Sequence, residues 1–179
     1  MYYTMIGSRE APQHILDLMI KLASKLAKQG WIGRSGGANG ADQCLEDGVC
    51  GILSSKVEIY LPWEGFNNKS CDNRGYINTP RLKNYTQAAL IAENTHPNWA
   101  ACSRGARALH TRNVYQLLGL DLNTPSKFVV CWAKPTGDGD NVKGGTGTAV
   151  RLGINYGVEI RNLYNKDVLD KVIKYLKED

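Results

Sequence analysis

Hydrophobic residues along this chain alternate between short β-type runs and stretches with helical spacing. The runs Tyr2–Ile6, Val57–Leu61 and Lys127–Trp132 are rich in β-branched and aromatic residues and predict strands. Between Pro12 and Gly30 the apolar residues recur on one helical face, at Ile15, Met19, Leu22, Ala23 and Leu26. Strands that alternate with helices favour a parallel sheet covered on both faces.

The same pattern continues to the end of the chain. We expect helices over Ala41–Val49 and Asn98–Leu118, a helix that begins in the cluster Gly144–Ala149, a strand over Val158–Leu163 and a final amphipathic helix. The segment from Pro62 to Pro97 is irregular apart from a helical stretch at Gln87–Glu93. The predicted fold is therefore a single α/β domain over residues 1–179, with an irregular insert at about residues 62–97.

Composition narrows the class of protein. The chain has 179 residues, 42% of them hydrophobic, and no apolar run that would span a bilayer. The first ten residues lack the features of a secretory signal, so we expect a cytoplasmic protein without a membrane partner. A net charge of +5 permits a nucleic-acid partner without requiring one. The five cysteines have neither C-x-x-C spacing nor a neighbouring histidine, so reduced structural thiols and no metal are expected.

Three glycine-containing loops follow predicted strands or begin predicted helices: Gly7–Arg9, Ser35–Asp42 (SGGANGAD) and Gly144–Thr148. Ligands of open parallel sheets bind beyond the carboxyl ends of the strands. Helix N-termini there present unpaired amides to phosphate groups. Arg9 adds a cation, and hydroxyls are available from Ser8, Ser35, Thr146 and Thr148. Neither longer loop fits the dinucleotide G-x-G-x-x-G pattern or the Walker pattern, which argues against a nicotinamide dehydrogenase and an ATPase.

The stretches GSR, SGGANGAD, LPWEGFN and GGTGTA, in this order, resemble the Rossmann-like SLOG superfamily, and the likeness extends from Ile6 to about Leu163. This superfamily includes the DprA DNA-processing proteins, YspA-like proteins and Lonely-guy-type phosphoribohydrolases. The resemblance implies a Rossmann-like sheet and a pocket for a nucleotide or nucleotide-derived molecule, with no cofactor. The predicted ligand-binding residues are Gly7, Ser8, Arg9, Ser35, Gly36, Gly37, Asn39, Gly40, Arg112, Asn113, Trp132, Gly144, Gly145, Thr146, Gly147 and Thr148.

Two functions follow from different branches of the superfamily. The DprA-like branch implies single-stranded DNA as partner and assembly into homo-oligomers, without chemistry on the ligand. The phosphoribohydrolase branch implies cleavage of an N-glycosidic bond with help from a carboxylate, for which Asp42 and Glu46 are the candidates. Asp42 is equally suited to cap its helix. Arg151 stands where the hydrolases have a glutamate, and a guanidinium opposes an oxocarbenium-like transition state, so binding is favoured over cleavage.

Binding of a DNA backbone requires several cations on one surface together with aromatic platforms for the bases. The chain offers arginines at positions 9, 34, 74, 104, 107 and 112, and aromatic rings at Trp63, Phe66, Tyr76 and Trp132. In the predicted helix Asn98–Leu118, the spacing of Arg107, His110 and Asn113 indicates a polar stripe on one face. His110 is interpreted as part of a binding or solvated face rather than as a catalyst.

Overall fold

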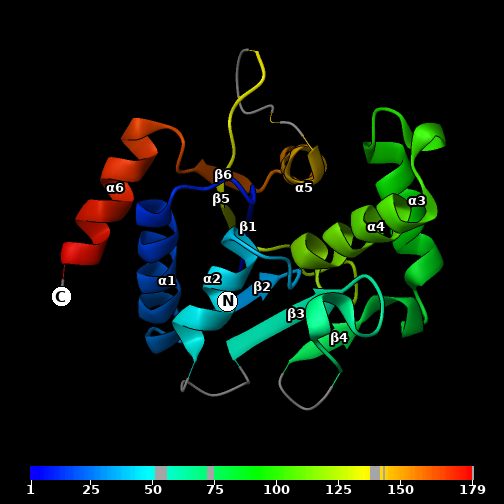
Figure 1. Cartoon of the computed structure of the whole chain (residues 1–179), viewed down its shortest axis with the longest axis horizontal. Coiled ribbons are helices and arrows are strands. Elements are labelled where there is room, and N and C mark those ends of the chain that lie inside the picture. Colours follow the sequence, from blue (N-terminus) through cyan, green and yellow to red (C-terminus); the bar gives the residue numbers. More distant parts are fainter. Residues whose placement is uncertain (51–55, 72–74, 138–141, 143, 179) are drawn as a thin grey trace.

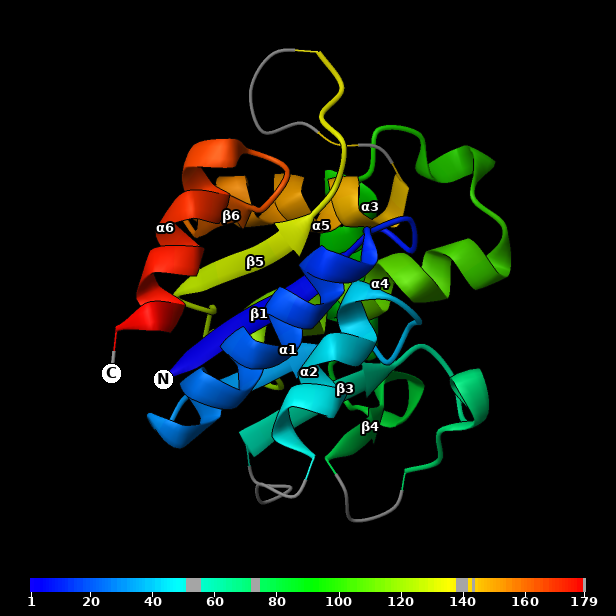
Figure 2. The ribbon, with the colours of Figure 1, turned by 60° about the vertical axis from the view of Figure 1, so that its left-hand side comes forward.

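Six parallel strands form the centre of the structure, which is a computed structural model that describes residues 1–50, 56–71, 75–137, 142 and 144–178. The strands are β1 (Tyr2–Gly7), β2 (Ile32–Ser35), β3 (Val57–Leu61), β4 (Tyr76–Asn78), β5 (Phe128–Trp132) and β6 (Glu159–Asn162). They lie in the order β4-β3-β2-β1-β5-β6, and each neighbouring pair is parallel. The order reverses between β1 and β5, which run side by side in Figure 2.

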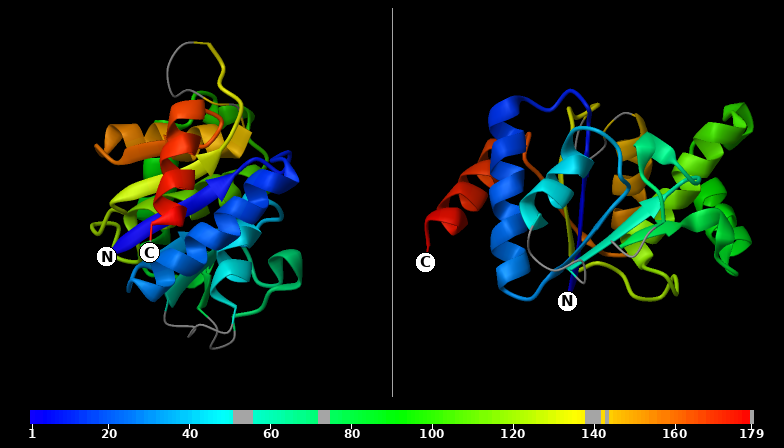
Figure 3. Two further views of the ribbon diagram at one scale, coloured as in Figure 1. Left: turned by 90° about the vertical axis from the view of Figure 1, so that its left-hand side faces the viewer. Right: turned by 60° about the horizontal axis from the view of Figure 1, so that its bottom comes forward.

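Helices cover both faces of the sheet (Figures 1 and 3). One face carries α1 (Gln13–Lys28), α2 (Ala41–Val49) and α6 (Lys166–Lys177), and the other carries α3 (Tyr85–Thr95), α4 (Arg104–Leu118) and α5 (Gly144–Asn155). None of the helices in the described part of the chain has the length and apolarity to cross a membrane. The predicted class, a Rossmann-like parallel α/β domain, is confirmed.

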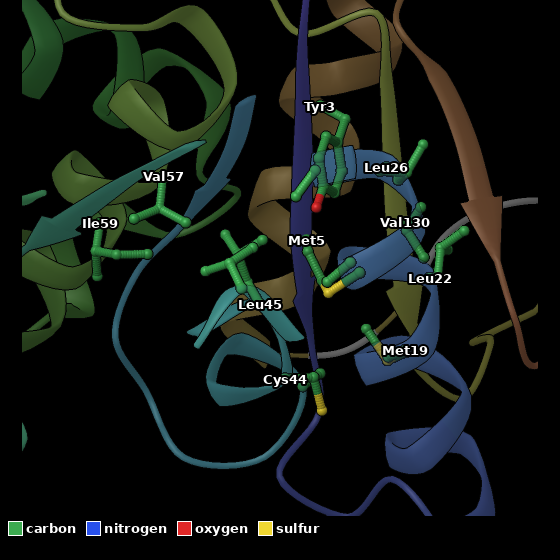
Figure 4. Packing of buried hydrophobic residues seen from close by; sticks show 14 of the residues in the cluster. Tyr3, Met5, Met19, Leu22, Leu26, Cys44, Leu45, Val57, Ile59 and Val130 are labelled. Atoms are coloured by element: carbon green, nitrogen blue, oxygen red, sulfur yellow. The ribbon is translucent and has the colours of Figure 1, made fainter. Parts of the chain in front are cut away.

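Strand side chains alternate between two apolar clusters, one on each side of the sheet. Tyr3 and Met5 of β1 pack against α1 and α2, where Figure 4 shows them beside Met19 and Leu45. Ile6 of the same strand packs instead with the helices of the opposite face. The central strands β1 and β5 are buried on both sides and are mostly apolar, as expected for a parallel sheet.

Two sequence predictions need correction. The helix expected over Asn98–Leu118 begins only at Arg104, because the Ser103 hydroxyl accepts a hydrogen bond from the Ala106 amide and caps α4 there. The residues before it form a separate short 3-10 turn, Trp99–Ala101. The segment 62–97, expected to be largely irregular, supplies the edge strand β4, two 3-10 turns (Phe66–Asn68 and Thr79–Arg81) and the whole of α3.

Candidate functional site

A pocket of about 360 Å³ lies at the carboxyl end of β1, beside the point where the strand order reverses. Residues from the β1–α1 loop, the β2–α2 connection, α4 and the start of α5 line it together. Pockets of parallel α/β proteins are expected at this position. The sequence-predicted residues found in its wall are Gly7, Ser8, Arg9, Asp42, Arg112, Asn113, Gly144, Gly145 and Thr146.

Close packing holds the first two glycine loops together, and the start of α5 joins them in the wall of the same pocket. A Cβ atom on Gly7 would lie 2.8 Å from the Ala41 Cβ and 2.9 Å from the Trp132 carbonyl oxygen, so the first loop fits tightly between α2 and β5. Gly40 approaches Arg9 in a similar way: its Cβ would lie 3.1 Å from the Arg9 Cα. The loops therefore converge at one edge of the sheet.

The Ser35–Asp42 loop does not offer its amides to a ligand in the way that the sequence suggests. The Asp42 carboxylate folds back and accepts hydrogen bonds from the Gly36 and Ala38 amides, at 3.2 and 3.4 Å. The Ser8 amide of the first loop is also occupied, because it donates to the Trp132 carbonyl at 2.9 Å. Asp42 thus acts as an internal anion for its own loop and makes no capping bond at the start of α2.

Arg112 of α4 neutralises Asp42. Its guanidinium lies 3.6 Å from the carboxylate, donates to the Gly36 carbonyl and faces the Phe66 ring. Burial of both partners raises the pKa of Asp42 against the opposing influence of Arg112 and the two amides, and lowers the pKa of Arg112. A Cβ on Gly36 would overlap the guanidinium, so any larger residue there must displace Arg112.

Gln116, which the sequence analysis did not select, lies in the pocket wall one helical turn after Arg112. Its side chain is 1% exposed, and neither its Nε2 nor its Oε1 has a hydrogen-bond partner among the described residues. Arg112 Nε is unpartnered in the same way. Buried polar groups are normally paired, so these atoms indicate a position where a ligand or water completes the structure. The i, i+4 spacing from Arg112 was the available sequence signal.

The mouth of the pocket carries the groups that remain open to an anion. Arg9 is exposed at the rim, and its charge contributes to the lowered pKa of the buried Arg112. Gly144, Gly145 and Thr146 begin α5, where the first amides have no carbonyl partner within the helix. Asn113 fixes this helix start to α4 by donating to the Gly145 carbonyl at 3.1 Å. Glu10 also borders the pocket and is exposed to water.

Other predicted site residues lie outside the pocket wall. Glu46, one of the two candidate catalytic carboxylates, pairs with Lys69 at 2.5 Å and accepts a hydrogen bond from the Tyr76 hydroxyl at 2.6 Å. The Trp132 side chain packs against Tyr164. The remaining residues outside the wall are Ser35, Gly36, Gly37, Asn39, Gly40, Gly147 and Thr148.

The three residues of the polar stripe predicted along α4 contact different parts of the protein. Asn113 faces the pocket, whereas Arg107 lies over the Trp99 ring at 5.5 Å and His110 lies against His96. Burial, followed by the neighbouring His96 and Arg112, lowers the pKa of His110 to about 4. The three residues therefore do not form one binding face, because α4 is packed on several sides.

A second groove, of about 1020 Å³, runs between α3 and α4. Its wall includes exposed Arg104 and Arg107, Trp99, and Trp63, which is 41% exposed. These are the aromatic and cationic groups that nucleic-acid strands contact. The groove accounts for three of the candidate DNA-contacting side chains that the sequence analysis named, Trp63, Arg104 and Arg107.

Two other candidates for DNA contact, Arg34 and Phe66, are buried and make their contacts inside the protein. Arg34 is 2% exposed, pairs with Glu58 at 2.8 Å and stacks over the Tyr2 ring, so it is unavailable to a backbone phosphate. Phe66 is buried against the Trp63 ring and the Arg112 guanidinium. Arg74 lies outside the described residues.

The strand order and the pocket at its reversal point define a Rossmann-like α/β fold with a pocket at the carboxyl edge of its sheet. A solved structure of DNA processing protein A from Helicobacter pylori has the same type of fold, with a TM-score of 0.55 and 19% sequence identity over 99% of this chain and 81% of that chain. That structure is described in terms of a unique mode of single-stranded DNA binding. No family model and no curated protein sequence matches this chain.

Proposed function

We propose that this protein binds single-stranded DNA without cleaving it, with one nucleotide unit held in the pocket beside β1. The observation that carries the proposal is the unpartnered Gln116 amide, buried in a pocket with exposed Arg9 at its rim. A carboxamide offers both donors and an acceptor, as the edge of a nucleobase does. The Arg9 guanidinium and the first amides of α5 are hydrogen-bond donors for the phosphate. The pocket volume of about 360 Å³ is within the range of small-molecule sites.

The groove between α3 and α4 favours a strand over a free nucleotide. Trp63 and Trp99 supply faces on which bases stack, and Arg104 and Arg107 supply charges for phosphates. Both the groove and the pocket include residues of α4, and we propose that one strand contacts both. The fold shared with a single-stranded DNA-binding protein supports this choice of ligand. Membership of the SLOG superfamily and assembly into homo-oligomers belong to the same proposal.

The contacts of the two predicted catalytic carboxylates, Asp42 and Glu46, argue for binding rather than cleavage. Asp42 is neutralised by Arg112 and accepts two amides of its own loop, and Glu46 is paired with Lys69 outside the pocket. Neither is an unpaired carboxylate beside a reacting sugar. We expect no free base after incubation with nucleoside monophosphates, measured by chromatography. Base release that disappears in Asp42→Asn or Glu46→Gln would replace the binding proposal with the glycosidase alternative.

Binding is tested by fluorescence anisotropy with a labelled single-stranded oligonucleotide over a salt series. Arg9→Ala removes one charge-assisted contact, so we expect about a tenfold loss of affinity and a salt slope smaller by about 0.7. Lys28→Ala is the control, because it removes an exposed positive charge from the carboxyl end of α1, away from the pocket. Equal affinities for these two variants would overturn the assignment of Arg9 as a phosphate contact at the pocket mouth.

Gly145 tests the start of α5 independently. A Cβ atom there would meet no atom within 4 Å and the position is exposed, so we expect substitutions to leave the packing intact. Gly145→Asp places a negative charge where the phosphate is expected and suits the helix N-terminus, so the affinity falls while thermal stability is kept. Gly145→Asn, of nearly the same shape, is the neutral control. Retention of full affinity by Gly145→Asp would exclude a phosphate at this helix end.

A further inference from the structure

Two of the three histidines of the chain and one cysteine meet between α3 and α4, although they are spread over fifteen positions of the sequence. His96 directly follows α3, Cys102 follows the short turn Trp99–Ala101, and His110 lies in α4. One nitrogen or sulfur atom from each lies within 4.8 Å of the corresponding atoms of the other two. The Cys102 Sγ is 3.7 Å from a ring nitrogen of His96, and the two imidazole rings are 4.4 Å apart between centroids.

The cluster contains an unused donor atom. His110 is 9% exposed, and its Nδ1 is buried without a hydrogen-bond partner among the described residues. A ring nitrogen in that position loses its interaction with water and gains nothing in return. The thiol of Cys102 makes a long contact of 3.6 Å with the Asn98 carbonyl. None of these atoms takes part in the pocket beside β1.

We propose that His96, Cys102 and His110 bind a zinc ion. Two imidazoles and a thiolate form a donor set that Zn²⁺ accepts in tetrahedral sites. Bond lengths of about 2.3 Å to sulfur and about 2.0–2.1 Å to nitrogen place neighbouring donor atoms roughly 3.5 Å apart. The cysteine and His96 already have this separation, at 3.7 Å.

Loading the metal requires small local changes. The Asn98 amide donates to the His96 Nδ1 at 3.1 Å, and this bond is given up when the ring turns a nitrogen towards the ion. The thiol loses its proton on binding, so one proton is released. Three protein ligands leave a fourth position for water, as in open zinc sites. Because Cys102 lines the groove between α3 and α4, the ion stands at the wall of that groove.

A bound ion would connect the segment after α3 to the body of α4. The residues between His96 and Ser103 are held by a 3-10 turn, a few ring contacts and a hydrogen bond that Arg107 donates to the Ala100 carbonyl. Metal that binds the folded state more strongly than the unfolded state raises stability by mass action. We therefore expect zinc to raise the melting temperature of the metal-free protein. This inference does not depend on the proposed DNA binding, because it concerns other residues and is measured without nucleic acid.

Cobalt(II) titration of the reduced, metal-stripped full chain tests the site. One equivalent of Co²⁺ should give the visible absorption of a tetrahedral ion and a thiolate-to-cobalt charge-transfer band, and Zn²⁺ should bleach both. Cys102→Ser should abolish the charge-transfer band, and His96→Gln and His110→Gln should weaken binding. Cys50→Ser and His14→Gln are matched controls, since both residues are exposed and lie elsewhere.

Circular dichroism establishes that each variant is folded before its titration is compared. Should Cys102→Ser fail to fold, His96→Gln serves as the variant, with loss of saturation as its readout. Absence of saturable cobalt absorbance in the wild-type chain would overturn the proposal. A charge-transfer band that survives Cys102→Ser but disappears in Cys50→Ser would overturn it as well, because the metal would then be held by a different thiol.

Discussion

Replacing Gln116 by leucine should raise the stability of the free protein and lower its affinity for the ligand. The side chain is 1% exposed, and both ends of its amide lack partners among the described residues. A buried polar group without a partner costs about 1–3 kcal/mol, whereas an apolar group of similar shape does not bear this cost. We expect the free energy of unfolding to rise by about 1–3 kcal/mol. For a chain of this length each kcal/mol corresponds to roughly 2–4 °C in melting temperature.

The same substitution removes the amide that we assign to base recognition. One hydrogen bond contributes about 0.5–1.5 kcal/mol net, so the affinity for single-stranded DNA should fall roughly 2- to 10-fold. Stability is measured by urea and thermal unfolding, and affinity by the anisotropy assay. Opposite changes in the two quantities are characteristic of a group kept for a ligand rather than for the fold.

Gln13→Leu is the control for this experiment. Gln13 is exposed at the first position of α1, so the same chemical change there should alter stability by less than about 0.5 kcal/mol. A loss of stability in Gln116→Leu would refute the reasoning, because it would mean that the amide is already hydrogen-bonded in the free protein. The polar groups of the pocket would then have their hydrogen-bond partners without a ligand.

Three further substitutions, one of them with a control, test the local structure. Gly36→Ala should destabilise by about 1–3 kcal/mol in urea unfolding because its methyl group overlaps the Arg112 guanidinium, which must shift, while Gly145→Ala, with open space around it, should change stability by less than about 1 kcal/mol. Asp42→Asn leaves Arg112 buried without its anion and should cost about 3–5 kcal/mol; unchanged stability would show that the pair is not structural. Ser103→Ala removes the cap of α4 and should cost about 1 kcal/mol, and a wild-type melting temperature would contradict the capping role.

The sequence was sufficient to predict the sheet and its helices because their signals are local. Apolar residues of α1 recur at helical spacing, and the strands are short runs of β-formers, so type and order follow from the pattern. The start of α4 was placed too early because Trp99 and Ala101 suit a helix, whereas the chain follows the Ser103 cap. The edge strand β4, with three residues, is too short to give a periodic signal.

The location of the pocket was also predictable, but the state of its groups was not. Parallel strands bring the loops that follow them to one edge, so Gly7–Arg9 and the start of α5 meet as expected. Nothing in SGGANGAD indicates that Asp42 folds back on the loop amides, because this depends on a buried cation from α4. The approach of Cys102 to His96 and His110 likewise depends on how two helices pack, and no residue spacing encodes it.

The internal Asp42 determines where an incoming phosphate can bind. The Gly36 and Ala38 amides donate to this carboxylate, and Arg112 balances its charge. These groups are therefore not available to a second anion. A second anion beside Asp42 would be repelled in a buried setting where charges are poorly screened. The exposed Arg9 and the first amides of α5 also line the pocket, and the one carboxylate beside them in the lining, Glu10, is exposed, so its charge is screened by water. The phosphate is therefore expected against α5, with the base directed inward to Gln116, and substitution of Gly145 rather than of the SGGANGAD glycines should change affinity without changing the fold.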